Sequence, residues 1–188
     1  ICELPSNGFM FRYYIHDPWW LNSPWYDRYN GNAHDIYLPM AITRVDAEGK
    51  VQSAETLNIL SIDNSYGNMP DNCVNEPLPH LLKAEKDIAD DIAPLVWVYP
   101  MREFTTAHSE EALYEMYFGD KYISEAINNG FPLNCVVSTD IFLKTSLDLY
   151  KKSILISPIP QTQEVRQRLI DFEIKGGRAA AWKFIDHL

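Results

Sequence analysis

Three short apolar runs, each closed by an acidic residue, recur along the middle of the chain. They are Leu57–Asp63 (LNILSID), Leu95–Glu103 (LVWVYPMRE) and Leu133–Asp140 (LNCVVSTD). Helical patterns at 79–87 and 109–129 separate them. Short buried strands that alternate with helices predict parallel βαβ units, because each crossover helix must cover a face of the sheet. We therefore predict an α/β fold in which three runs are neighbouring parallel strands, namely 57–62, 95–100 and 133–138.

The flanking segments extend this pattern. Residues 9–16 and 35–46 have the β-branched and aromatic content of strands, and a turn with Gly49 follows the second. A second helical piece is expected within 109–129, after the stripe that contains Leu113 and Met116. Near the end, a strand at 153–158, an amphipathic helix at 163–175 and a further strand from Arg178 to Trp182 are predicted. The Gly176-Gly177 pair marks the end of the last helix.

An aromatic segment lies near the start of the chain, at residues 13–29 (YYIHDPWWLNSPWYDRY). Flat ring faces beside carboxylates and amides suit the C–H face and hydroxyl rim of a sugar. The alternative is a buried, irregular aromatic loop, which the high average burial of Trp and Tyr favours. As a sugar platform, the segment gives these candidate substrate-binding residues: Trp19, Trp20, Trp25, Tyr26, Asp17 and Arg28.

The acids that close the three runs are the candidate catalytic residues, Glu103, Asp63 and Asp140. Enzymes with barrel or open α/β folds carry their chemistry at the carboxyl ends of parallel strands. Glycoside hydrolysis needs two carboxyl groups, about 5–5.5 Å apart for retention or about 6.5–9.5 Å apart for inversion. The alternative is structural: such acids also cap helix N-termini or pair with an arginine, here Arg102, Arg12 or Arg44.

The stretch SILISPIPQTQEVRQRLIDFEIKGGR carries a resemblance to a known family. It is similar to the strand, helix and Gly-Gly turn that open the glutamine-amidotransferase-like domain of several bacterial sugar hydrolases. The β-galactosidases with a trimerisation domain after their catalytic barrel are an example. This resemblance implies a portion of a (β/α)8 barrel at 1–145 and the start of a flavodoxin-like unit at 146–188. It also implies a glycoside hydrolase whose partner is carbohydrate.

The resemblance covers about the last 130 residues and does not extend to the catalytic glutamates of that family, which have no residue-by-residue match here. Glu103 lies at a suitable position without a diagnostic motif around it. A complete barrel takes about 250 residues, so the chain is expected to be part of a longer protein. A non-catalytic module that binds carbohydrate or assembles subunits through residues 13–29 is the alternative function.

Composition argues against several classes of partner. The net charge of −10 disfavours nucleic acid and anionic membrane surfaces, because both require clustered Lys and Arg. No apolar run approaches the length of a transmembrane helix. The chain lacks GxGxxG and Walker patterns, so no cofactor is predicted. Its three cysteines are far apart without a CxxC pair, which favours a reducing compartment and hence the cytoplasm. The oligomeric state stays open, with a homo-oligomer among the alternatives.

No metal site is predicted either. The doublets His16-Asp17 and His34-Asp35 could belong to a phosphohydrolase centre, but loop residues that bond the backbone are the favoured interpretation. Residues 63–72 (DNSYGNMPDN) are rich in oxygen ligands suited to calcium. They lack the alternation and the closing glutamate of an EF-hand loop, which favours a structured turn.

Overall fold

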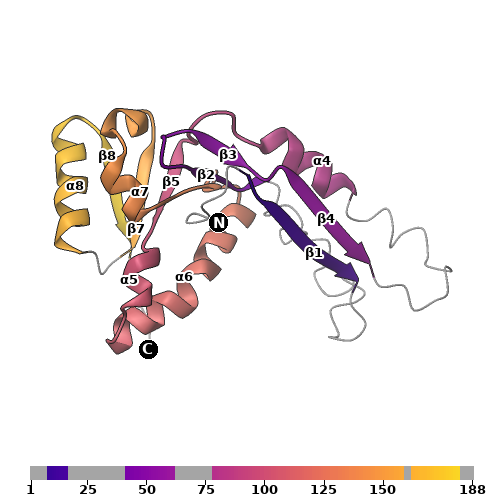
Figure 1. The fold of residues 1–188 in the computed structure, drawn as a ribbon, viewed down its shortest axis with the longest axis horizontal. Helices are drawn as coiled ribbons and strands as arrows, with labels where there is room; N and C mark the ends of the chain where they lie inside the picture. The colour runs from indigo at the N-terminus through magenta and orange to yellow at the C-terminus, as the bar shows by residue number, and fades with distance from the viewer. Residues whose placement is uncertain (1–7, 17–40, 62–77, 159–161, 183–188) are drawn as a thin grey trace. The chain divides into compact units, whose positions relative to one another are not determined.

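The computed structural model describes residues 8–16, 41–61, 78–158 and 162–182 (Figure 1). These residues form two compact units. The two-stranded unit comprises residues 8–16, 41–42, 53–61 and 78–88, and the six-stranded unit comprises 43–52, 89–158 and 162–182.

The two-stranded unit pairs β1 (Met10–His16) with β4 (Thr56–Ser61) in parallel. Helix α4 (Leu78–Asp87) also belongs to it and agrees with the predicted helix. The prediction that residues 57–62 lie beside the other two apolar runs is wrong, because β4 pairs with β1 in a separate sheet. An apolar run shows that a strand is buried, but its neighbour is chosen by long-range packing.

The six-stranded sheet has the order β3-β2-β6-β5-β7-β8. Strand β6 pairs in parallel with β2 and β5, while β7 pairs in parallel with β5 and β8. The predicted α/β class with parallel strands is confirmed, as is the pairing of the second and third apolar runs. Within the described residues the sheet is open, and β3 and β8 are its edge strands. The strands are β2 (Thr43–Val45), β3 (Val51–Ser53), β5 (Leu95–Tyr99), β6 (Cys135–Ser138), β7 (Ile154–Pro158) and β8 (Arg178–Trp182).

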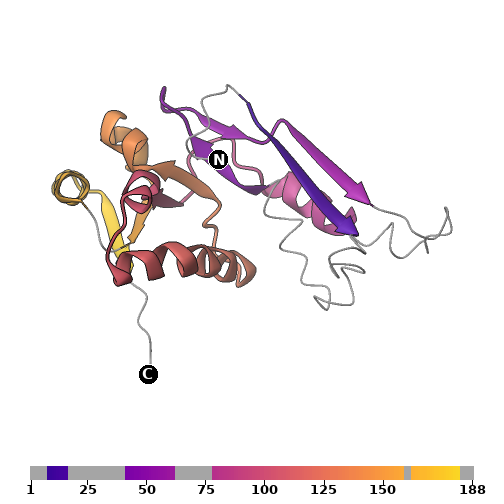
Figure 2. The same cartoon turned by 60° about the horizontal axis from the view of Figure 1, so that its bottom comes forward.

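The chain reverses direction within this sheet. It passes from β5 to β6 on one side, and then crosses back to β7 and β8 on the other side of β5. Because crossovers between parallel strands are right-handed, this reversal places helices on both faces. Figures 1 and 2 show α6 on one face, with α7 and α8 on the opposite one. The helices are α5 (Met101–Thr105), α6 (Glu110–Asn128), α7 (Thr139–Lys144), the 3₁₀ helix η2 (Leu147–Tyr150) and α8 (Gln163–Ile174).

Local chemistry explains where the longer helices begin and end. Ser109 Oγ accepts a hydrogen bond from Ala112 N at 3.1 Å before α6, and Thr162 Oγ1 accepts one from Val165 N at 3.3 Å before α8. Gly130 and Gly176 follow these helices with φ of +85° and +87°. The bounds of α6 and α8 agree to within one residue with the predicted helices at 109–129 and 163–175. The two helical pieces expected at 109–129 are one continuous helix.

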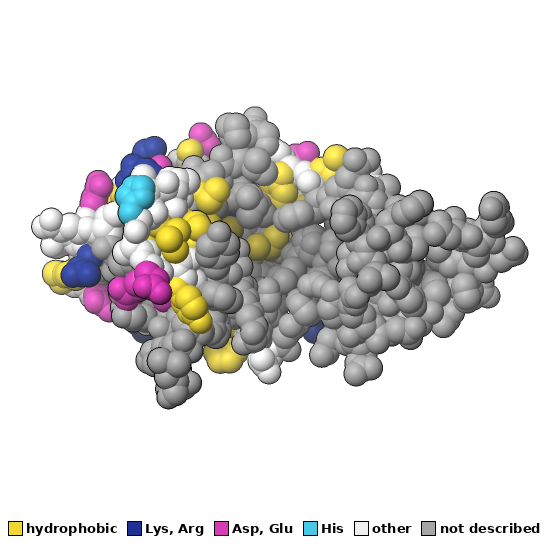
Figure 3. Space-filling model, turned by 90° about the horizontal axis from the view of Figure 1, so that it is seen from below, with side chains coloured by type: hydrophobic (Ala, Val, Ile, Leu, Met, Phe, Trp, Pro, Cys, Tyr) yellow, Lys and Arg dark blue, Asp and Glu magenta, His cyan; other side chains and the backbone are white. Residues whose placement is uncertain are grey.

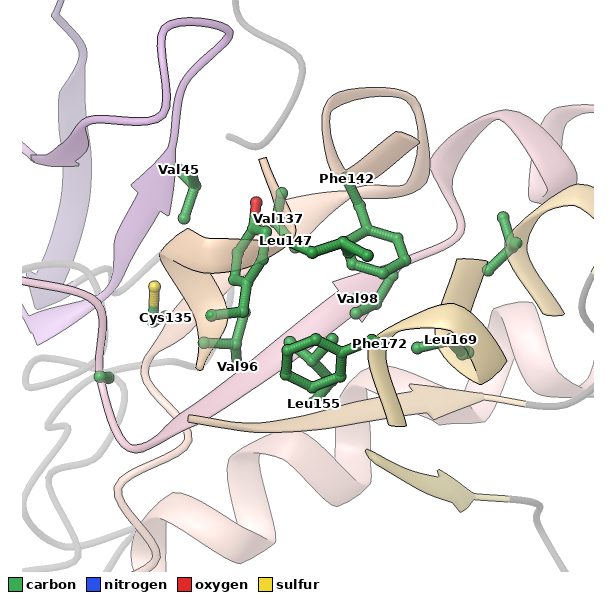
Figure 4. Packing of buried hydrophobic residues seen from close by; sticks show 13 residues of the cluster. Val45, Val96, Val98, Cys135, Val137, Phe142, Leu147, Leu155, Leu169 and Phe172 are labelled. Carbon is green, nitrogen blue, oxygen red and sulfur yellow. The ribbon is translucent and has the colours of Figure 1, made fainter. Parts of the chain in front are cut away.

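The hydrophobic core of the six-stranded unit lies between the sheet and the helices α7, η2 and α8. Figure 4 shows Phe142, Leu169 and Phe172 packed over strand residues on that face. Phe142 and Tyr150 are fully buried, and their rings meet edge to face with centroids 5.6 Å apart. Gly177 is needed beside this core, because a Cβ at that position would lie 2.4 Å from the Phe172 ring. Among the described residues, no helix is long and apolar enough to cross a membrane.

Arg168 joins α8 to the end of α7. Its Nε donates to the carbonyl of Phe142 at 3.2 Å, its Nη2 donates to the carbonyl of Thr145, and its guanidinium lies 5.8 Å from the Phe142 ring centroid. The last carbonyls of a helix have no partner inside the helix. The guanidinium therefore satisfies backbone groups at the C-terminus of α7, where a positive charge also complements the helix dipole.

We expect Arg168→Met to lower the free energy of unfolding by about 1–2 kcal/mol, because the apolar stem is kept while both carbonyls lose their charged donor. Urea denaturation followed by circular dichroism measures this loss. Arg166→Met is the matched control, since Arg166 is exposed on the same helix. Equal stability of the two variants would contradict the role of the Arg168 hydrogen bonds.

Tyr150 is a buried phenol whose hydroxyl lies 2.8 Å from Thr145 Oγ1. Thr145 Oγ1 in turn donates to the carbonyl of Ile141 at 2.9 Å, so the phenol donates to the threonine. Burial raises the pKa of Tyr150 to about 12, mainly because the ionised form is poorly solvated there. In the unfolded chain a tyrosine has a pKa of about 10.

This difference predicts a loss of stability at alkaline pH. The unfolded state releases the Tyr150 proton from pH 10 upward, while the folded state keeps it until about pH 12. Between these values deprotonation lowers the free energy of the unfolded state relative to the folded state, so the folded state loses about 2 kcal/mol of stability near pH 11.5. Denaturant unfolding of wild type and Tyr150→Phe at pH 9 and pH 11.5 tests this. The wild type should lose about 2 kcal/mol more than the variant, and parallel losses would contradict it.

Candidate functional site

The described candidate acids lie at the carboxyl ends of β5 and β6. In the parallel register Tyr99 is opposite Ser138, so the two strands end at the same level. A short helix starts just beyond each strand, α5 after β5 and α7 after β6. The carboxyl edge thus brings the first turns of two helices together, although they are about forty residues apart in the chain.

Glu103 and Thr139 form the central contact of this edge. Thr139 Oγ1 donates a hydrogen bond to Glu103 Oε2 at 2.7 Å, and the Thr139 residue is only 3% exposed. The other carboxylate oxygen, Oε1, is buried and has no hydrogen-bond partner among the described residues. A buried carboxylate oxygen without a donor is costly to the folded state. A catalytic role is one explanation for a buried polar atom that has no hydrogen-bond partner.

Arg102 and Asp140 form a second contact between the same helices. Arg102 Nη1 lies 2.9 Å from Asp140 Oδ1, with the side chains 53% and 29% exposed. An ion pair this open to water contributes only about 0–1 kcal/mol to stability. Its effect is geometric, because it links the first turn of α5 to the first turn of α7. We call Arg102, Glu103, Thr139 and Asp140 the edge cluster.

The sequence explains why helices form at these places. Pro100 follows β5, and its carbonyl accepts from Phe104 N at 2.9 Å to start the turn of α5. The rings of Tyr99 and Phe104 then meet edge to face with centroids 5.7 Å apart. Ser138 Oγ accepts from Ile141 N at 3.2 Å and caps α7.

The acids were predicted just beyond the carboxyl ends of strands at 95–100 and 133–138, and the structure adds a helix start at each of these positions. β5 stops at Tyr99 and β6 at Ser138, so Glu103 and Asp140 both lie in first helical turns. Negative charge is favourable there because of the helix dipole. The structural alternative, in which an acid pairs with Arg102, is confirmed for Asp140.

Other candidate residues lie outside the described part of the chain. This applies to the catalytic candidate Asp63, and also to the calcium segment and the second His-Asp doublet. The candidate sugar-binding residues fall there too, namely Trp19, Trp20, Trp25, Tyr26, Asp17 and Arg28. Their part in a site stays a prediction.

Thr139 was missed by the sequence reasoning. The available signal was the run Ser138-Thr139-Asp140 directly after a buried strand, which is typical of a helix start. A helix of six residues is too short for apolar periodicity to reveal it, and α5 escaped notice for the same reason.

Figure 3 views the molecule from below, the side on which α5 lies in Figure 1, and acidic side chains lie there beside hydrophobic ones on the six-stranded unit. Among the described residues, no three His, Cys, Asp or Glu side chains are grouped to hold a metal ion. Cys135 is buried in β6, and burial raises the pKa of its thiol. It therefore packs as a core residue.

Comparison with known proteins adds no relative. No protein-family model, curated protein or solved structure matches this chain.

The edge cluster can support proton transfer. It holds two carboxyl groups on neighbouring helix starts, one oriented by a threonine hydroxyl and the other by an arginine. Acid–base hydrolysis of glycosidic bonds uses two positioned carboxyl groups.

Proposed function

We propose that the chain belongs to a carbohydrate-active protein that hydrolyses glycosidic bonds, with Glu103 as the general acid/base and Asp140 as the second carboxyl group. The observation that supports this most directly is the state of Glu103. One of its oxygens is held by Thr139, and the other is buried without a hydrogen-bond partner among the described residues. An oxygen without a protein donor can exchange a proton with a substrate.

In this mechanism the proton on Glu103 moves to the glycosidic oxygen as the bond between that oxygen and the anomeric carbon breaks. In an inverting reaction Asp140 takes the proton of the attacking water as the bond breaks, and the two carboxyl groups return to their starting states by proton exchange with solvent. In a retaining reaction Asp140 forms the covalent intermediate, and Glu103 takes back a proton from the water that hydrolyses it. Oε1 is covered in this structure, so substrate binding has to displace the groups that cover it. Asp63 stays a further candidate for the second carboxyl group.

The wider architecture of the proposal is a portion of a (β/α)8 barrel that leads into a flavodoxin-like unit. The order β6-β5-β7-β8 supports a doubly wound arrangement, because such sheets have this order with its reversal beside the first strand. It includes β5 and β6, which precede the flavodoxin-like unit proposed at 146–188. In such sheets ligands bind outside the carboxyl ends of the strands. We propose the cytoplasm as the location on the cysteine pattern alone.

A second candidate is a non-catalytic module that binds carbohydrate or assembles subunits. The ion pair between Arg102 and Asp140 favours it, since a carboxyl group occupied by an arginine is less free to act on a substrate. The aromatic segment at 13–29 would then supply the binding surface.

One experiment separates the two candidates. The full-length protein is assayed for release of nitrophenol from a panel of aryl glycosides, and for binding of oligosaccharides by calorimetry. Turnover supports the hydrolase, while binding without turnover supports the module. A protein that neither hydrolyses nor binds any sugar of the panels would contradict both.

A further inference from the structure

We propose that Thr139 is the positioning residue of Glu103, and that its hydroxyl selects Oε1 as the oxygen that exchanges the proton. This inference rests on the proposed hydrolytic function. A hydrogen bond from Thr139 Oγ1 to Glu103 Oε2, 2.7 Å long, links α7 to α5 through the candidate acid.

Thr139 is held firmly enough to orient another side chain. Its neighbour Ser138 belongs to β6, lies opposite Tyr99 in the sheet, and caps α7 through its own side chain. Thr139 is 3% exposed, so solvent scarcely competes for its hydroxyl. A β-branched side chain also has few χ1 rotamers, which limits the positions that the hydroxyl can take.

The orientation of the Glu103 carboxylate depends on this hydrogen bond. Glu103 lies on a helix of five residues and has a long side chain with several rotatable bonds. A donor that binds one carboxylate oxygen fixes the plane of the group and leaves the other oxygen to the substrate. Fixing a reacting group in advance lowers the entropy cost of reaching the transition state.

Two substitutions of Thr139 therefore separate the effect of its hydroxyl group from the effect of its shape. Thr139→Val keeps the shape but removes the donor, whereas Thr139→Ser keeps the donor. The assay uses an aryl glycoside that the full-length protein hydrolyses. We expect Thr139→Val to lower kcat by about tenfold to a hundredfold, because a hydrogen bond to a charged group contributes a free energy of that size. KM should change little, and Ser should restore kcat to within about threefold of wild type.

A double-mutant cycle separates positioning from a general structural role. If Thr139 acts through Glu103, Thr139→Val should cause no further loss of kcat in a Glu103→Gln background. A further tenfold loss there would overturn the inference. So would a single Thr139→Val variant with wild-type kcat. Should Thr139→Val fold poorly in thermal melts, Thr139→Ala replaces it in the same cycle.

The proposed function fails by a different result. If Glu103→Gln hydrolyses the glycoside as fast as wild type, Glu103 is a structural acid, and the role of Thr139 is overturned with it. If Glu103→Gln loses activity while Thr139→Val keeps it, the proposed function stands and only the positioning role is wrong.

Discussion

Glu103→Gln is expected to lower kcat for aryl glycosides by roughly 10²–10⁴-fold, the usual contribution of general acid–base catalysis. The amide preserves the size of the side chain, and its carbonyl can still accept the hydrogen bond from Thr139. It cannot deliver a proton to the leaving oxygen. Substrate binding and folding should therefore stay close to wild type, and steady-state kinetics with thermal melts measure both.

The leaving group provides a sharper form of this test. A leaving group that is stable as an anion, such as dinitrophenolate, needs little protonation, whereas an alkyl alcohol needs it fully. The loss of kcat should consequently be larger for poor leaving groups. Glu173→Gln is the matched control, because Glu173 is exposed on α8. A loss that is the same for all leaving groups would show that Glu103 is not the acid.

Phe142→Ala is expected to lower the free energy of unfolding by about 3–5 kcal/mol, because it opens a cavity at a fully buried position. The change removes the ring that meets Tyr150 edge to face and that lies under the Arg168 guanidinium. In a domain whose total stability is about 5–15 kcal/mol, this is a large fraction. For a chain of this size the melting temperature should fall by about 6–20 °C.

Phe131→Ala controls for the loss of an aromatic ring as such, since Phe131 is 60% exposed. It should change the free energy of unfolding by no more than about 0.5 kcal/mol. Phe142 also anchors the helix that carries Thr139 and Asp140, so its loss should reduce activity together with stability. Indistinguishable melting of the two variants would contradict the core described for the six-stranded unit.

Sequence reasoning located the candidate site only in part. Glu103 and Asp140 were recognised because acids followed buried runs, and the structure places both at one carboxyl edge. Thr139 and the short helices α5 and α7 were not recognised. A hydroxyl becomes a positioning group only when a carboxylate comes within hydrogen-bond reach, and here that partner is 36 residues away in the chain.

The sequence by itself determined the longer helices, because their causes are local. Apolar periodicity and capping residues such as Ser109 and Thr162 set the helices, and Gly130 and Gly176 ended them through positive φ. The pairing of β5 with β6 was predicted from the sequence, but only the tertiary structure decided the other strand neighbours. It placed β4 beside β1 and left β5 between β6 and β7. An apolar run is compatible with many neighbours, and the choice among them depends on the packing of residues that are distant in the chain.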